Sequence, residues 1–190
     1  MNEKKAGGIT ALISSCIDPD EDNLIAKILI RGGADVNIIT DMGSSALNEA
    51  VINENSELIK LLLKKNASVF FEEEKFRMQS PFFVALKKQY ITAIELFCDH
   101  GADLDKRLAN GQTPMIYAAA ENFDQACMYL SLRTRNIDQE DDNGTNIFIK
   151  YILNNDLDHC TQLLMRDADI NHINKQGKTP LHLAVENRVN

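Results

Sequence analysis

The chain reads Gly-Lys-Thr-Pro-Leu-His-Leu-Ala-Val at residues 177–185, and it reads Gly-Gln-Thr-Pro-Met-Ile-Tyr-Ala-Ala at residues 111–119. Looser copies of the same stretch occur earlier and between these two. Counted from the position of the Thr, the copies begin at residues 10, 45, 80, 113, 146 and 179, so the steps between them are 35, 35, 33, 33 and 33. A period of this length indicates a stack of similar units, each of which buries its apolar face only against its neighbours.

Local signals within one period predict two helices. Thr113 is a favourable N-cap residue, and Pro114 follows at the first helical position, where its missing N–H costs nothing. A second apolar pattern follows at Ala126, Cys127 and Leu130, and its i, i+1, i+4 spacing recurs in the other units. This spacing marks one face of a helix rather than a strand. The sequence therefore predicts a pair of helices in each unit.

The second helix of each unit ends at a residue that we expect to adopt a left-handed backbone; these residues are Gly33, Asn66, Gly101, Thr134 and Asp167. Glycine adopts that conformation freely, and Asn and Asp tolerate it. Thr134 is the exception because its side chain is β-branched. This register predicts that Thr134→Gly stabilises the protein.

Polar segments between the units are predicted to form β-turn fingers, at residues 38–43, 70–78, 106–111, 139–144 and 172–177. The second of these fingers is longer than its neighbours and carries Phe70, Phe71 and Phe76. The fold does not require aromatic residues there. They either fold back over the core or, if they are exposed, act as anchors for a partner.

Residues 110–120 and 174–186 carry the motif of the ankyrin-repeat family, which the chain resembles from about Ala6 to its end. The resemblance implies an all-α ankyrin-repeat solenoid of helix-turn-helix units joined by β-turn fingers. It also implies a single domain over residues 1–190, with units at about 6–40, 41–73, 74–108, 109–141 and 142–173 and a partial unit at 174–190. Because the last unit has no second helix and matches the family motif well, we expect a fragment of a longer protein.

Composition restricts the classes of partner. The formal net charge of −8 argues against binding to nucleic acid or to an anionic membrane surface. No stretch approaches the apolar length of a transmembrane helix. The four cysteines, Cys16, Cys98, Cys127 and Cys160, lie far apart at positions where the repeat uses small apolar residues. We therefore expect buried, reduced thiols in a cytoplasmic protein, with the nucleus as the other intracellular location.

The sequence offers no constellation of residues typical of catalysis. It has no phosphate-binding loop, and its histidines lack the spacing of metal ligands. The neighbours His159 and Cys160 both fall on the apolar face of a second helix, which favours a role in the core. We expect no enzyme activity, no cofactor and no metal site.

In the ankyrin family, partners usually contact the concave face formed by the finger tips and the exposed side of the first helices. Carried over by register, the resemblance implies twelve partner-binding residues: Met42, Phe76, Arg77, Lys87, Lys88, Arg107, Asn110, Glu121, Glu140, Asp142, Asn143 and Lys175. The middle of this strip is basic and the next finger is acidic. This pattern fits either a solvated face whose charges offset one another or the electrostatic orientation of an extended peptide.

The sequence thus predicts a non-catalytic scaffold that binds a partner protein or peptide on this face, as a monomer. Two alternatives belong to other classes. The repeats could regulate or tether an enzyme or a channel in a larger protein, or they could form a host-directed ankyrin effector.

Overall fold

The structure is a computed structural model that describes residues 2–20, 22–107 and 111–189. The chain divides into two compact units, Met1–Ala102 and Asp103–Asn190. Each unit is built from helix pairs, and the described residues contain no β-strand beyond one isolated bridge between Glu140 and Asn146. The predicted all-α fold is confirmed. The extent of the predicted single domain stays a prediction.

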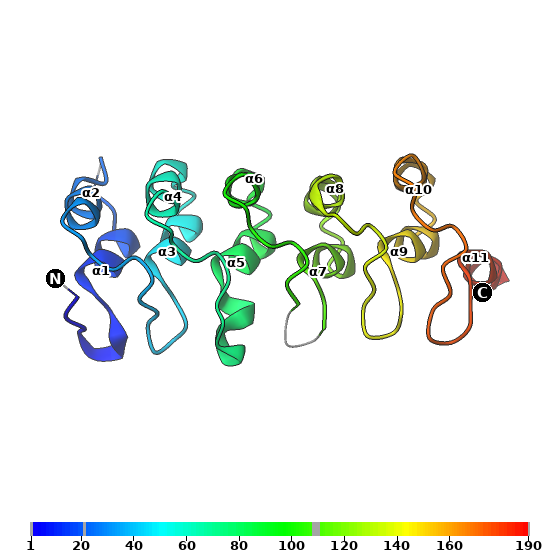
Figure 1. Cartoon of the computed structure of the whole chain (residues 1–190), viewed down its shortest axis with the longest axis horizontal. Helices are drawn as coiled ribbons and strands as arrows, with labels where there is room; N and C mark the ends of the chain where they lie inside the picture. The colour runs from blue at the N-terminus through cyan, green and yellow to red at the C-terminus, as the bar shows by residue number, and fades with distance from the viewer. Residues whose placement is uncertain (1, 21, 108–110, 190) are drawn as a thin grey trace. The chain divides into compact units, whose positions relative to one another are not determined.

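The first unit contains three helix pairs and two short 3₁₀ helices. Its helices are η1 (Ala6–Gly8), α1 (Ala11–Ile17), α2 (Leu24–Arg31), α3 (Ala46–Ile52), α4 (Ser56–Leu63), η2 (Glu74–Gln79), α5 (Pro81–Lys87) and α6 (Ile91–Asp99). The first helices α1, α3 and α5 pack side by side, and α2, α4 and α6 form a second row (Figure 1). Each helix pair therefore covers the apolar face of the next.

The second unit repeats this arrangement. Its helices are α7 (Pro114–Ala120), α8 (Asp124–Arg133), α9 (Ile147–Leu153), α10 (Leu157–Leu164) and α11 (Pro180–Val189). Here α9 packs against both α7 and α11, while α8 and α10 pair with α7 and α9 (Figure 1). The predicted helix pairs are thus present in both units.

Side-chain caps begin most of the first helices where the sequence predicts them. The hydroxyl of Thr113 accepts a hydrogen bond from the backbone N–H of Ile116 at 3.4 Å, and the side chain of Asn146 accepts one from Ile149 at 2.9 Å. Ser45 forms a reciprocal capping box with Asn48, which stands where the family motif has His. The Asn48 amide also donates to the Gln79 carbonyl at 2.6 Å, so this residue links its own repeat to the next.

Four of the five predicted left-handed residues adopt that conformation, with φ of 86° at Gly33, 60° at Asn66, 81° at Gly101 and 61° at Asp167. The prediction for Thr134 is wrong. Its φ is −66° and its ψ is 148°, which is extended backbone.

The buried surroundings of Thr134 explain this difference. Its hydroxyl donates to the Asn136 carbonyl at 3.1 Å and accepts from the Gln139 amide at 3.1 Å. The Gln139 amide also donates to Asp105, and its oxygen accepts a hydrogen bond from Thr113 at 2.6 Å. A buried network of side chains therefore holds the end of α8, which the sequence register alone does not reveal.

A second set of left-handed residues lies between the two helices of a pair, at Asn23, Glu54, Gln89, Asn122 and Asn155, with φ between 52° and 58°. Asn is enriched in this conformation, whereas Glu and Gln are not. The strain is therefore concentrated at Glu54 and Gln89, in the second and third helix pairs of the first unit.

The predicted β-turn at residues 70–78 is wrong, because the second half of the segment belongs to the 3₁₀ helix η2 (Glu74–Gln79). Phe71 is buried, and the Phe70 ring stacks on Phe82 with ring centres 4.9 Å apart. A Cβ atom at Gly43 would collide with the side chains of Phe76 and Gln79. The extra residues thus pack against the core and the preceding finger. Tight turns do form at residues 40–43, 141–144 and 174–177.

Gln89→Gly should stabilise the protein by about 1 kcal/mol, because glycine removes the steric cost of the left-handed backbone at an exposed position. Gln89→Ala is the matched control, since it removes the same side chain but keeps the Cβ atom. Urea unfolding measures both. A Gly variant no more stable than the Ala variant would contradict the prediction.

Thr134→Gly should destabilise the protein by about 2 kcal/mol, the reverse of the expectation from the sequence. Glycine loses the hydroxyl bonds to Asn136 and Gln139 and adds backbone freedom to the unfolded chain. Thr134→Ser keeps the hydroxyl and should lie close to the native chain in the same urea titration. Equal stability of the Gly and Ser variants would show that the network contributes nothing.

Candidate functional site

A pocket of about 190 Å³ lies between α7 and α9 in the second unit. Its lining residues come from the two first helices and from the finger between them: Ile116, Ala119, Ala120, Asp141, Thr145, Asn146, Lys150 and Leu153. The helices contribute mainly apolar side chains, whereas the finger contributes polar ones. The pocket can therefore accept an apolar side chain and offer polar contacts beside it.

Backbone hydrogen bonds fix the finger at the edge of this pocket. One carboxylate oxygen of Asp141 accepts from the backbone N–H groups of Asn143 at 2.8 Å and Thr145 at 2.9 Å. The Gly144 N–H donates to the Asp141 carbonyl at 3.0 Å, which closes the turn. Asn146 then caps α9, so the finger passes directly into a helix. The edge of the pocket is therefore preorganised.

Neighbouring fingers of the second unit are tied to one another. The guanidinium of Arg107 donates to the carbonyls of Gly111 at 2.6 Å and Glu140 at 3.3 Å. The Lys175 ammonium donates to the Asp142 carbonyl at 2.7 Å, and its backbone N–H donates to the Asn143 carbonyl at 3.2 Å. Arg107 and Lys175 thus support the fingers, in addition to the partner contact predicted for them.

The other predicted residues of this unit differ in accessibility. Glu121, Asp142 and Asn143 are exposed, whereas Glu140 is half-buried. The Glu140 carboxylate lies 3.7 Å from Nε2 of the buried His172, and this nitrogen also bonds the Gly144 carbonyl at 2.8 Å. Asn110 lies outside the described residues.

In the first unit, the predicted residues do not form one uniform exposed surface. Met42 is 81% exposed at a finger tip, and Lys87 is exposed at the end of α5. The Lys88 ammonium lies 3.4 Å from the Glu54 carboxylate. Phe76 and Arg77 are half-buried in η2. Partner binding by any of the twelve residues stays a prediction.

Three of the four thiols lie in surroundings that suppress their reactivity. Cys16, Cys127 and Cys160 are buried, and Cys98 is half-buried. Burial raises the pKa of Cys16 and of Cys127 to about 12 and that of Cys160 to about 11. The thiolate, which is the reactive form, is therefore disfavoured at neutral pH.

His159 also has a structural role, as its position on the apolar face predicts. Its ring stacks on Tyr151 with centres 4.7 Å apart, and its Nδ1 lies 2.6 Å from the Asp156 carboxylate. Partial burial alone would raise the pKa of Asp156, but hydrogen bonds from the backbone and ring of His159 hold it below its usual value. Asp156 in turn caps α10.

Within the described part of the chain, no group of His, Cys, Asp and Glu side chains is arranged to hold a metal ion. None of the helices described is both long and apolar enough to cross a membrane.

Sequence reasoning missed the apolar part of the pocket, namely Ile116, Ala119 and Ala120, together with Lys150. The small residues of the α7 stretch were a usable signal, because alanines on a first helix leave space beside the next one. That this space would remain open depends on the position of α9, which the sequence does not specify.

Comparisons with known proteins agree with this architecture. A family profile described as "Ankyrin repeats (3 copies)" matches residues 1–73. Rabankyrin-5 from Mus musculus is 26% identical over 95% of this chain, and the chain spans 17% of that protein's length.

Two solved structures have a similar fold. An ankyrin-repeat domain from Acinetobacter baumannii has a TM-score of 0.78 at 22% identity, covering 93% of this chain and 91% of that one. A chain in the complex of a predatory endopeptidase from Bdellovibrio bacteriovorus with an immunity protein has a TM-score of 0.71 at 20% identity, covering 98% and 94%. At these identities the likeness concerns the fold alone. The recurring motif, the stacked helix pairs and these similarities together identify the chain as an ankyrin-repeat protein with an all-α solenoid fold.

Proposed function

We propose that the chain is a non-catalytic protein-binding module whose second compact unit holds an extended segment of a partner protein. The segment lies along the fingers and the inner side of α7 and α9. The observation that carries this proposal is the pocket between these helices, because an apolar recess there adjoins a polar finger whose backbone is fixed by hydrogen bonds. Ankyrin repeats generally serve as protein-interaction modules, which supports the same class of function.

The chemistry of the pocket favours one side chain of the partner as an anchor. Ala120 is exposed and Leu153 is 38% exposed in the lining, so an aliphatic side chain would remove apolar surface from water there. Asp141 and Lys150 place one charge of each sign in the lining. We therefore propose a medium-sized aliphatic residue as the anchor, with polar neighbours that bond the finger.

Exposed groups beside the pocket give the partner further polar contacts. Glu121, Asp142 and Asn143 are exposed in the same unit, and the hydrogen bonds from Arg107 and Lys175 hold the finger backbone in place. A preordered surface loses less conformational entropy on binding than a mobile one. This supports recognition of an extended segment without a large rearrangement of the scaffold.

A regulatory or tethering role within a larger protein is compatible with the same pocket. The chain spans only a small part of Rabankyrin-5. In that case the partner would be another part of the same protein. We place the module in the cytoplasm, where its four free cysteines would stay reduced.

Leu153→Glu should abolish capture of the partner from a cell lysate, because it places a charge in the apolar recess. Leu157→Glu is the matched control: it makes the same change at a 62% exposed leucine of α10 that does not line the pocket. Mass spectrometry of the proteins held by each bait identifies the partner. Titration of the purified partner should then show at least a tenfold loss of affinity for Leu153→Glu alone.

Circular dichroism checks that all three baits are folded. Equal affinity of the native chain and of folded Leu153→Glu would place the contact elsewhere and overturn the proposed site. Equal loss in both variants would also overturn it, since Leu157 lies outside the pocket.

A further inference from the structure

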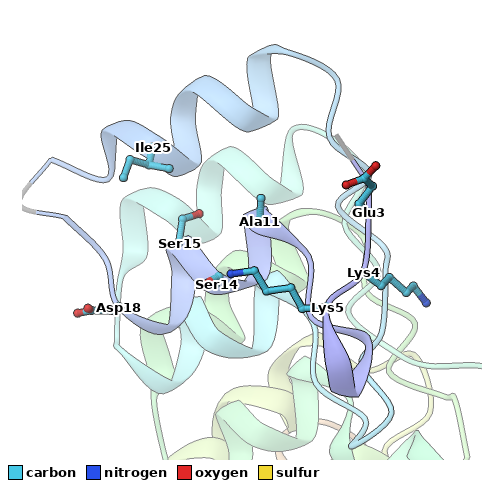
Figure 2. Close-up of a pocket in the computed structure, with 8 residues that line it drawn as sticks. All are labelled: Glu3, Lys4, Lys5, Ala11, Ser14, Ser15, Asp18 and Ile25. Atoms are coloured by element: carbon cyan, nitrogen blue, oxygen red, sulfur yellow. The ribbon is translucent and has the colours of Figure 1, made fainter.

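An open groove of about 610 Å³ lies on the outer side of the first helix pair. It is lined by the N-terminal segment, by α1 and by α2: Glu3, Lys4, Lys5, Ala11, Ser14, Ser15, Asp18 and Ile25. Figure 2 shows Asp18 at one end of the groove and Glu3 and Lys4 at the other, with Ile25 on the side of α2. The pocket described above does not involve this face.

In the next helix pair, the corresponding positions are covered. Ala11, Ser15 and Ile25 correspond by register to Ala46, Ala50 and Leu58, which are at most 1% exposed. Helices α1 and α2 pack against the helices that carry those residues. Ile25, in contrast, is 55% exposed. The groove therefore corresponds to a surface that, in the next helix pair, is covered by the packing of α1 and α2.

The exposed surface beside the groove is apolar. Leu24, Ile25 and Ile28 lie on one side of α2 and are 55%, 55% and 59% exposed. The opposite side of α2 packs inward through Ala26 and Ile30. Several large apolar side chains that lie together on a surface commonly mark an interaction site.

Charges of opposite sign lie at the two ends of this face. Lys4 and Lys5 belong to the N-terminal segment, at the end of the groove opposite Asp18, and the Lys5 side chain extends along the groove toward Ser14 (Figure 2). The loop between α1 and α2 carries Asp18 and Asp22 at the other end. Glu3 is the exception at the basic end.

We propose that this face binds a second copy of the same chain through a two-fold symmetric contact. A two-fold axis across the groove places the basic end of each copy over the acidic end of the other, and it packs the exposed apolar sides of the two α2 helices against each other. Lys5 of one copy then faces Asp18 of the other, twice. Closed two-fold dimers are the commonest form of homo-oligomer, and they require this kind of self-complementary surface. The resulting dimer departs from the monomer expected from the sequence.

Sedimentation velocity over a range of protein concentrations tests the dimer. The native chain should shift from monomer to dimer with no larger species, and Ile25→Glu should stay monomeric with an unchanged melting temperature. Leu181→Glu is the control, since Leu181 is 74% exposed on α11 and lies far along the chain from the groove. It should dimerise like the native chain. A native chain that stays monomeric at every concentration would overturn the proposal.

The native chain could also form species larger than the dimer. If Leu181→Glu abolishes those species, the proposal is overturned, because that result indicates head-to-tail stacking of α11 onto the groove. A reciprocal charge exchange distinguishes the two-fold contact from misfolding. Lys5→Glu and Asp18→Lys should each weaken dimerisation at least tenfold when studied alone. Mixed together they should form a heterodimer, because both ion pairs are then restored with their signs reversed. A mixture no more dimeric than its components would contradict the pairing of Lys5 with Asp18.

Discussion

No helix pair in this chain can bury its apolar face without a neighbour, and the remaining features depend on that constraint. Within the first unit, Ala46 and Ala50 let α3 approach the helices on either side, and both are almost fully buried. Within the second unit, Ala118 of α7 has the same role. Close contact between first helices sets where the fingers emerge, and it leaves the pocket between α7 and α9 where the contacting side chains are small.

Much of the fold could be predicted because its signals are local. The period, the caps at Thr113 and Asn146 and the left-handed residues at four helix ends each depend on a few neighbouring residues. Thr134 could not be predicted in this way, since its conformation depends on a network with Asp105, which lies 29 residues before it, and with Gln139 in the finger that follows. The η2 helix was missed because its packing against Gly43 is also a contact between repeats.

The candidate site was less predictable than the fold. Register alone places residues on a finger, but it does not say whether their polar groups are already engaged. Arg107 and Lys175 illustrate this, because both were predicted to contact a partner and both bond the backbone of the next or preceding finger. The apolar pocket residues carried no charge or motif that would single them out, and their accessibility follows only from the packing of α7 against α9.

The bonds between fingers have a consequence for how such a surface can diversify. Arg107 and Lys175 donate to backbone carbonyls of Glu140 and Asp142, not to their carboxylates. Every residue supplies a carbonyl, so the acidic side chains at these positions can be exchanged while the link between fingers persists. The hydrogen bonds that support the fingers therefore do not depend on the acidic side chains that a partner would meet. Substitutions during evolution can thus change what the finger tips recognise while the hydrogen bonds between the fingers are kept.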